Sequence, residues 1–168
     1  IFVGDTSVHE YPTSEQMAEM AISTARVVRL FGFDPKVAFV SHSTFGQPLT
    51  NRTKHIRKAV DILKEKKVDF EFDGDMQPDV ALNEEYKSLY PFSKLVGNAN
   101  ILIMPGQHSA AISYKMMKTL GDTKVIGPLL IGLGLPIEIA PLRSSTSEII
   151  NLASIAAYSA DVINYKKD

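Results

Sequence analysis

Short apolar runs alternate along this chain with segments of ten or more residues that have helical periodicity, and this alternation constrains the fold more than any other feature. A helix of that length returns the chain to the starting edge of a sheet, so the strands on either side of it run in the same direction. The pattern therefore predicts a largely parallel sheet with helices on its faces. Strands are predicted at residues 1–4, 37–41, 69–72, 101–104, 125–126 and 137–140.

Four helices are predicted from apolar residues at three- and four-residue spacing and from capping residues at the helix ends. Thr13 and Gln16 form a capping box before the first helix, which stops at Gly32. The other three helices are predicted over residues 51–65, 109–120 and 147–164.

Charge and composition narrow the classes of function. With 18 Lys and Arg against 19 Asp and Glu, the formal net charge is −1, so the chain lacks the basic surface that binds nucleic acid or anionic membranes. The absence of cysteine excludes a disulfide framework, a thiolate zinc site and a cysteine nucleophile, and it fits a cytoplasmic protein. The most apolar stretch, residues 125–142, is interrupted by glycines, prolines and Glu138, so no membrane span is predicted.

The chain has 168 residues, which fits one domain of ordinary size. It opens on Ile1-Phe2-Val3, without Met and without a positively charged segment. We therefore expect a fragment of a longer protein rather than a natural N-terminus or a signal peptide.

Four loops are expected at the carboxyl ends of the strands, where open parallel sheets bind ligands. The first reads Ser-His-Ser-Thr-Phe-Gly over residues 41–46. Its hydroxyl groups and glycine can bind a phosphate or the amide of a phosphopantetheine arm. A polar loop that hydrogen-bonds to its own backbone is the alternative, and composition alone favours that alternative.

The second loop carries Asp73, Asp75 and Asp79, three carboxylates within seven residues. A calcium loop needs further ligands and a distal glutamate, and none lies at the required offset. A general base is possible, but a turn followed by a helix that Asp79 caps fits the residues better.

The third and fourth loops each precede a predicted helix. Residues 105–109 lead into the helix that carries Tyr114 and Lys115, and the amides of its first turn suit an anion, although Ser109 can equally serve as a simple cap. Residues 141–146 place Arg143 beside three hydroxyl residues, which is the best anion site in the chain. The alternative is a helix capped by Ser145 or Thr146 together with Glu148. No catalytic triad spacing, GxGxxG or P-loop is present.

Five segments in order resemble conserved blocks of the phosphate acetyl- and butyryltransferase family. Residues 37–46 look like the strand and loop LSxSxxG, and residues 72–77 look like DGExQ. Residues 99–105 with 112–115 are similar to ANxLxxP followed by YK; residues 126–132 with 135–136 are similar to IGPxxxGxxKP; and residues 148–151 resemble DIVN. Within this family the closest resemblance is to the C-terminal domain of large bacterial NADP-dependent malic enzymes, which carry SHSxFG and ISY as residues 41–46 and 112–114 do here.

The resemblance implies a three-layer α/β/α fold of the isocitrate/isopropylmalate dehydrogenase-like, phosphotransacetylase type. It implies two lobes, with residues 1–135 in one lobe and residues 136–168 returning to the other. It also implies a homodimer or higher oligomer, and acetyl-CoA as an allosteric ligand that inhibits the malic enzyme. NADP and a divalent metal, Mg or Mn, are expected to bind upstream of this chain, where malate is converted to pyruvate, CO2 and NADPH.

One departure from the family pattern affects catalysis. Transacetylases have an SRG turn before the last helix, in which the serine and arginine hold phosphate and the developing oxyanion, and an aspartate that acts on the CoA thiol. Aligned without gaps on Asn151, these positions hold Pro141, Leu142 and Glu148, and Arg143 could replace the arginine only with a one-residue shift. A leucine cannot bind phosphate through a bidentate contact, and a proline has neither a hydroxyl nor an amide donor.

We therefore expect a non-catalytic, acetyl-CoA-sensing and oligomerisation domain with no catalytic residue and no metal site. Two alternatives stay open: an active phosphate acetyltransferase, and a purely structural dimerisation domain. The candidate ligand-binding residues are Ser41, Ser43, Tyr114, Lys115, Arg143, Ser144 and Ser145.

Overall fold

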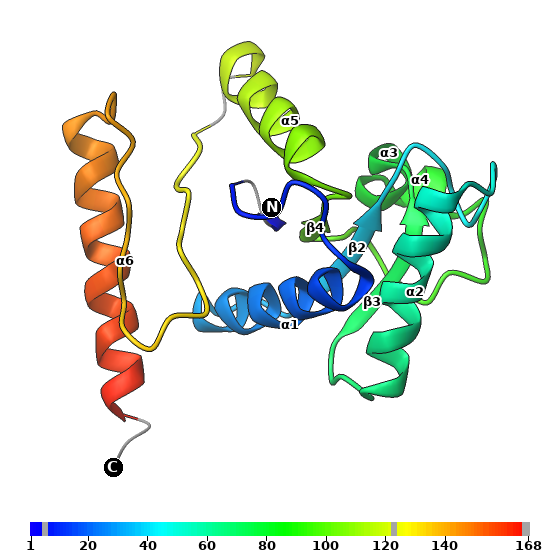
Figure 1. Cartoon of the computed structure of the whole chain (residues 1–168), viewed down its shortest axis with the longest axis horizontal. Helices are drawn as coiled ribbons and strands as arrows, with labels where there is room; N and C mark the ends of the chain where they lie inside the picture. The colour runs from blue at the N-terminus through cyan, green and yellow to red at the C-terminus, as the bar shows by residue number, and fades with distance from the viewer. Residues whose placement is uncertain (5–6, 122–123, 166–168) are drawn as a thin grey trace. The chain divides into compact units, whose positions relative to one another are not determined.

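A computed structural model describes residues 1–4, 7–121 and 124–165, the last five by their backbone alone. The chain divides into two compact units, Ile1–Lys115 and Met116–Asp168 (Figure 1). The elements in chain order are β1 Phe2–Gly4, α1 Ser14–Leu30, β2 Lys36–Val40, α2 Asn51–Glu65, β3 Glu71–Met76, α3 Pro78–Leu82, α4 Glu84–Lys87, β4 Ile101–Ile103, α5 Gln107–Leu120 and α6 Thr146–Tyr165.

The first unit is built on a four-stranded sheet in the order β1-β4-β2-β3. All three neighbouring pairs are parallel, with Val37 opposite Phe72 on one side of β2 and opposite Ile101 on the other. The register shifts after Phe39, because two residues of β3 then lie opposite one residue of β2. The predicted parallel sheet is confirmed for these four strands.

The strand β3 is longer than the sequence predicts. It continues to Met76, so Asp73 and Asp75 lie within the strand and not in a loop. Both side chains are buried. A carboxylate can occupy such a position when neighbouring groups donate hydrogen bonds to it, which the charge pattern of the sequence does not reveal.

Helices cover both faces of this sheet, so the first unit has three layers. Val37 and Phe39 point into a core formed with α1 and α2, while Ala38 and Val40 point into a second core on the other face. This alternation follows from the two-residue repeat of a strand. Residues of α3, α5 and the segment before β4 complete the second core: Val80, Ala81, Leu95, Ala99 and Ala110.

Of the two long helices of the first unit, α1 begins where its capping residues predict, and α2 begins at the predicted residue 51. Thr13 accepts from the backbone N–H of Gln16 at 3.1 Å, and the Gln16 side chain accepts from Thr13 N at 2.8 Å. Thr50 and Thr53 repeat the arrangement at the start of α2. Each reciprocal pair satisfies two of the N–H groups that a helix N-terminus leaves free.

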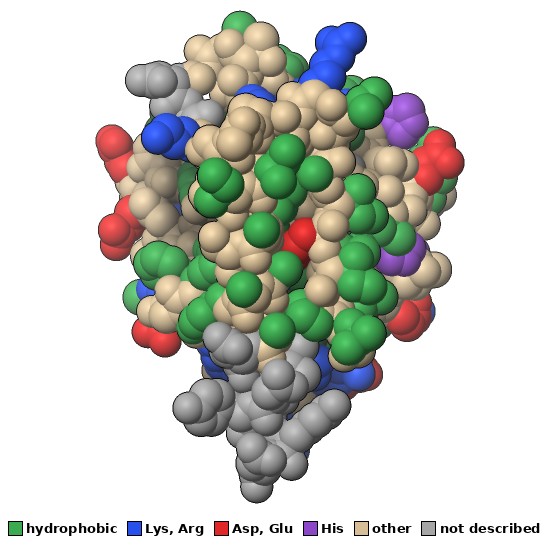
Figure 2. Space-filling view, turned by 90° about the vertical axis from the view of Figure 1, so that its left-hand side faces the viewer, with side chains coloured by type: hydrophobic (Ala, Val, Ile, Leu, Met, Phe, Trp, Pro, Cys, Tyr) green, Lys and Arg blue, Asp and Glu red, His purple; other side chains and the backbone are tan. Residues whose placement is uncertain are grey.

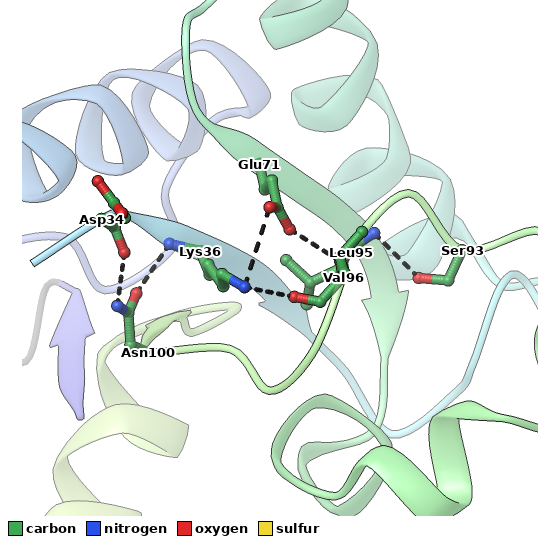
Figure 3. A network of polar contacts seen from close by, with 7 residues as sticks. All are labelled: Asp34, Lys36, Glu71, Ser93, Leu95, Val96 and Asn100. Carbon is green, nitrogen blue, oxygen red and sulfur yellow. Dashed lines mark hydrogen bonds and ion pairs between the residues drawn. The ribbon is translucent and has the colours of Figure 1, made fainter.

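A polar network joins the starting ends of β2 and β3 to the segment that enters β4 (Figure 3). Lys36 donates to the carbonyl of Val96 at 2.6 Å, and Val96 N donates to Glu71 at 2.8 Å. The side chain of Asn100 accepts from Lys36 N at 2.8 Å and donates to the carbonyl of Asp34 at 2.7 Å. These contacts occupy the starting ends of the strands. The ligand edge of an open parallel sheet is the opposite one, at the carboxyl ends.

The strands predicted at residues 125–126 and 137–140 are wrong: residues 124–145 have no regular secondary structure in the part of the chain that the structure describes. Pro128 and Pro136 lack the N–H that a strand needs to pair, and glycines separate the remaining apolar residues. Ile139 is 60% exposed, so the apolar composition of this segment does not reflect a buried strand.

Two predicted caps are also wrong. α3 begins at Pro78 after Gln77, so Asp79 lies in the first turn, where its carboxylate accepts from Val80 N. α5 begins at Gln107, two residues before Ser109, whose hydroxyl donates to the carbonyl of Gly106 at 2.8 Å. The sequence does not predict the short helices α3 and α4, because five and four residues are too few to establish a helical period.

In the second unit, α6 is the one helix that follows α5 in the part of the chain that the structure describes. Ser145 and Glu148 form a capping box at its start: Ser145 N donates to the Glu148 carboxylate at 2.8 Å, and Glu148 N donates to the Ser145 hydroxyl at 3.3 Å. The lobe boundary near residue 135 stays a prediction. No helix among the described residues combines the length and the apolar character needed to cross a bilayer.

Candidate functional site

An open pocket of about 440 Å³ lies at the carboxyl ends of β2 and β4 in the first unit. This is the edge at which open parallel sheets bind ligands. Six short segments contribute to its wall: Glu10 and Tyr11 after β1, Val40 to His42 at the end of β2, Arg52 at the start of α2, Pro78 at the start of α3, Met104 to Gly106 after β4, and His108, Ser109 and Ser113 on α5.

The loop at residues 41–46 is fixed against the end of β3 by main-chain contacts. Ser41 N donates to the carbonyl of Met76 at 2.9 Å, which continues the β2–β3 pairing by one residue. Gln77 N donates to the Thr44 hydroxyl at 3.1 Å, and the Gln77 side chain donates to the carbonyl of His42 at 2.9 Å. The segment with three carboxylates therefore anchors the hydroxyl loop.

A buried carboxylate occupies the centre of this loop. The Ser43 hydroxyl donates to Asp75 Oδ2 in a short hydrogen bond, and Gly46 N donates to the same oxygen at 3.3 Å. Phe45 N donates to the Asp75 carbonyl at 2.6 Å. Ser41 Oγ lies 3.4 Å from both the amide nitrogen and the hydroxyl of Ser43. Ser43 is thus the link between the pocket-lining Ser41 and the carboxylate behind it.

A histidine fixes the part of the pocket wall that contains Tyr11 and Arg52. His55 Nε2 lies 3.0 Å from the carbonyl of Pro12, and since a carbonyl can only accept, this nitrogen carries a hydrogen. The Ser14 hydroxyl donates to the carbonyl of His55 at 2.8 Å. These contacts fix the end of the β1–α1 loop on α2, where the Arg52 guanidinium lies 5.2 Å from the centre of the Tyr11 ring.

The β4–α5 loop closes the pocket by a close backbone approach. A Cβ atom at Gly106 would lie 2.6 Å from the carbonyl oxygen of Glu10, so a side chain at this position would push the two loops apart. Gln107 N donates to the carbonyl of His9 at 3.2 Å. The Glu10 carboxylate lies 3.7 Å from His108 Nε2, which places a second polar pair at the rim.

The structure separates the seven predicted site residues into three groups. Ser41 lines the pocket, and Ser43 is buried behind it. Tyr114 and Lys115 follow Ser113 on α5 but do not line the pocket, and the Lys115 ammonium lies 5.9 Å from the centre of the Tyr114 ring. Arg143, Ser144 and Ser145 belong to the second unit. The pocket itself is formed by residues of the first unit alone.

In the second unit, the turn before α6 has the geometry of a helix cap. Ser144 N donates to the carbonyl of Pro141 at 2.9 Å, and Glu148 accepts from Lys118 at 2.8 Å in addition to its bonds from Ser145. The Lys118 hydrogen bond and then the Ser145 donors lower the pKa of Glu148 from 4.5 to about 2. The Glu148 carboxylate, at the position where the resemblance implies an aspartate, is therefore an ionised capping group.

Sequence reasoning does not identify the charged residues of the pocket, above all Arg52, Glu10 and His108. Arg52 lies in the first turn of the helix that directly follows the hydroxyl loop, which is the available signal. No group of three or more His, Cys, Asp or Glu side chains suited to a metal ion occurs among the residues whose side chains are described. Hydroxyl groups, imidazoles, a guanidinium and the Glu10 carboxylate make the pocket suitable for a polar organic ligand.

Comparison with known proteins identifies the fold family. The family model for phosphate acetyl/butaryl transferase matches residues 1–157. An NADP-dependent malic enzyme of Rhizobium meliloti is 48% identical over 160 residues, covering 95% of this chain and 21% of that protein. A phosphate acetyltransferase of Clostridium acetobutylicum is 34% identical, covering 95% of this chain and 49% of that protein.

A solved structure agrees with these matches. A phosphotransacetylase from Streptococcus pyogenes superposes with a TM-score of 0.87 at 34% identity, covering 95% of this chain and 49% of that one. The chain thus spans about a fifth of the length of the malic enzymes it matches, where it corresponds to their C-terminal domain, and about half of the Clostridium acetobutylicum phosphate acetyltransferase. Because the family model covers nearly all of its residues, the chain belongs to the phosphate acetyl/butaryl transferase family.

Proposed function

We propose that this chain is a regulatory domain of a malic enzyme, and that it binds acetyl-CoA without transferring the acetyl group. One observation carries the proposal: the pocket at the strand ends is formed, while the turn before α6 lacks the chemistry of a transferase. Leu142 stands where the resemblance implies a phosphate-binding arginine, and its side chain is fully exposed. Pro141 stands at the serine position, and Glu148 caps the helix. In most enzymes electrostatic stabilisation of the transition state contributes more to the rate than any other effect, so its loss removes turnover.

The pocket supports binding of an anionic acyl carrier. Acetyl-CoA carries phosphates that require cations or amide donors, and it has an apolar arm interrupted by amides. Arg52 supplies a cation at the rim, and the first turn of α5 supplies backbone N–H groups at the positive end of a helix dipole. The buried Ser41 faces the pocket beside Val40 and Met104, a mixed polar and apolar lining suited to an amide-containing chain.

The second unit supports self-association as part of the same proposal. Hydrophobic side chains gather over α6 on the face shown in Figure 2, and Ile150 is 58% exposed. Apolar patches of this kind are usually covered by another protein surface. We propose that a second copy of the chain covers this one, in a homodimer or a higher oligomer.

The remaining parts of the proposal concern the protein to which this domain belongs. Its relatives named NADP-dependent malic enzymes are about five times as long as the matched region, since the match covers 21% of the Rhizobium protein. NADP and Mg or Mn are assigned to that additional part, together with the conversion of malate to pyruvate, CO2 and NADPH. The location is proposed to be the cytoplasm.

An active phosphate acetyltransferase is the second candidate, favoured by the 34% identity to the Clostridium acetobutylicum enzyme. A purely structural dimerisation domain is the third. One experiment separates all three: titrate the full-length protein with acetyl-CoA by calorimetry, and measure malate oxidation and phosphate-dependent CoA release in parallel. Binding with inhibition and no CoA release supports the regulatory domain. CoA release supports the transferase, and absence of binding supports the structural domain.

A further inference from the structure

Two buried aspartates on β3 have the same chemistry but hold different parts of the molecule. Asp73 and Asp75 are 7% and 0% exposed. Asp73 accepts from Lys94 N at 2.6 Å and from the Ser93 hydroxyl at 3.1 Å, and so fixes the segment that leads to β4. Asp75 accepts from the loop at residues 41–46, part of which lines the pocket.

The irregularity in β3 explains how Asp75 reaches this loop. Phe39 pairs with Gly74 and Val40 pairs with Met76, which leaves Asp75 as the extra residue of a bulge. A bulged residue leaves the regular alternation of the strand, and its side chain can point where a paired residue cannot. Gly74 makes this possible, because its φ is +152° and a Cβ there would lie 2.7 Å from the Phe39 carbonyl oxygen.

The Asp75 carboxylate has donors on one oxygen only. Oδ2 accepts from Ser43 and Gly46, whereas Oδ1 has no hydrogen-bond partner among the described residues. A buried carboxylate with an unpaired oxygen is destabilising compared with an apolar side chain of the same size. Both donors to Oδ2 belong to the loop at residues 41–46, which indicates that the role of Asp75 concerns this loop.

We propose that Asp75 is a positioning residue for the ligand pocket: it sets the conformation of the loop at residues 41–46 through Ser43 and Gly46, without touching the ligand. Ser43 also contacts the pocket-lining Ser41, so a change at Asp75 reaches the pocket through one intermediate side chain. The ligand in this proposal is acetyl-CoA, and to that extent the inference rests on the proposed function.

The test compares three variants of the full-length protein. Asp75→Asn and Ser43→Ala each weaken the link, while Asp73→Asn is the matched control, because it alters a similarly buried carboxylate of the same strand that does not contact the loop. Acetyl-CoA affinity is measured by calorimetry, and hydrogen exchange of the backbone amides in residues 41–46 is measured by mass spectrometry.

We expect Asp75→Asn and Ser43→Ala to raise the Kd at least about tenfold, equivalent to about 1.4 kcal/mol. Asp75→Asn should also accelerate backbone hydrogen exchange in residues 41–46 by at least about tenfold, because the Gly46 amide loses a charged acceptor. Asp73→Asn should lower the melting temperature but leave the Kd, and the exchange rate of residues 41–46, within about twofold of the values of the unmodified protein.

The outcomes separate this inference from the proposed function. Equal effects of Asp75→Asn and Asp73→Asn on Kd and exchange, or no effect of either, overturn the positioning role. Absence of acetyl-CoA binding in the unmodified protein overturns the proposed ligand, and the exchange of residues 41–46 then decides the positioning role by itself. If Asp75→Asn does not fold, Ser43→Ala provides the same comparison, since it removes one neutral donor and leaves the carboxylate in place.

Discussion

Ser145 and Glu148 close the N-terminus of α6 through reciprocal hydrogen bonds, with the Ser145 amide donating to the Glu148 carboxylate at 2.8 Å and the Glu148 amide donating to the Ser145 hydroxyl at 3.3 Å. Lys118 adds a third donor to the same carboxylate at 2.8 Å. The arrangement needs an ionised Glu148, so the stability of the cap depends on pH.

The melting temperature should follow the ionisation of this cap. The pKa of Glu148 falls from 4.5 to about 2 because Lys118 and Ser145 stabilise its charged form. A carboxyl group with a lowered folded-state pKa stabilises fully above its unfolded value, and the stabilisation disappears as pH falls from about 4.5 through about 2. Thermal unfolding followed by circular dichroism should show a decline in melting temperature over this window that is smaller in Glu148→Gln. Ser147→Ala, in the same turn but outside the cap, is the control, and a Glu148→Gln profile identical to that of the parent protein contradicts the prediction.

Gly74 permits the bulge in β3, so its replacement should destabilise the fold. Its φ of +152° disfavours other residues, and a Cβ would lie 2.7 Å from the Phe39 carbonyl oxygen and 2.8 Å from the Phe39 Cβ. Gly74→Ala should therefore lower the free energy of unfolding by more than about 3 kcal/mol, through strain and overlap together. Gly32→Ala is the matched control, since Gly32 has a φ of +82° but no atom within 4 Å of the place its Cβ would take, and a loss of about 1–2 kcal/mol is expected there. Equal losses in urea unfolding would show that overlap is unimportant.

The parts of the fold that can be predicted from the sequence are those in which local and long-range signals agree. α1 and α2 combine a capping residue with an apolar stripe, and β2 and β4 are short apolar runs, in β2 after the initial Lys36. The segment at residues 124–145 has apolar residues without either signal. Whether such residues form a strand depends on a neighbouring strand that the local sequence does not specify, and prolines and glycines oppose it here.

The site is predictable to the extent that it follows from topology. Ser41 can be identified because the carboxyl ends of parallel strands form the ligand edge. Arg52 cannot be identified in this way, because its position depends on contacts between segments that are distant in the sequence. Its guanidinium lies over the Tyr11 ring, and His55 joins α2 to the β1–α1 loop. The role of Asp75 depends on a one-residue bulge, which the alternation of apolar and polar residues in β3 does not reveal.

The second unit should mediate self-association. The protein should have at least twice the mass of one chain in solution at concentrations on the order of micromolar. Ile150→Glu, which places a charge on the exposed apolar face of α6, should shift the mass toward the monomer, because a buried unpaired charge is strongly unfavourable. Glu65→Lys, at the end of α2 in the first unit, is the charge-changing control. Sedimentation analysis is the measurement, and a monomeric parent protein rules out the proposal.

The protein should not form acetyl phosphate. Active enzymes turn over at about 1 to 10³ per second, and no phosphate-dependent release of CoA in that range is expected. The reason is that neither the Pro141 nor the Leu142 side chain can donate to a phosphoryl oxygen, and Glu148 is bound by Ser145 and Lys118. CoA release followed with a thiol reagent is the measurement, with an authentic phosphate acetyltransferase as the positive control. Turnover in the enzymatic range would make the transferase the correct function.

The pocket can be tested through its arginine. Arg52 lies at the pocket rim with its guanidinium 5.2 Å from the centre of the Tyr11 ring, where it can pair with a phosphate of acetyl-CoA while staying over the ring. Removing one charge-assisted contact in Arg52→Ala should reduce binding by about 1.5–3 kcal/mol, which is roughly a tenfold to hundredfold increase in Kd. Inhibition of malate oxidation by acetyl-CoA should shift to higher concentrations by the same factor.

Lys54 provides the control for this prediction, because it is an exposed cation two residues further along α2 and does not line the pocket. Lys54→Ala removes the same charge from the same helix, so any effect of net charge on the approach of an anionic ligand is shared by both variants. Arg143→Ala and Lys115→Ala, made in parallel, test the cations that the sequence alone suggests. A Kd that rises in Arg52→Ala but not in Lys54→Ala places acetyl-CoA in the pocket at the ends of β2 and β4. A Kd that rises only in Arg143→Ala transfers the site to the turn before α6, and equal affinities in all four variants remove acetyl-CoA from both places.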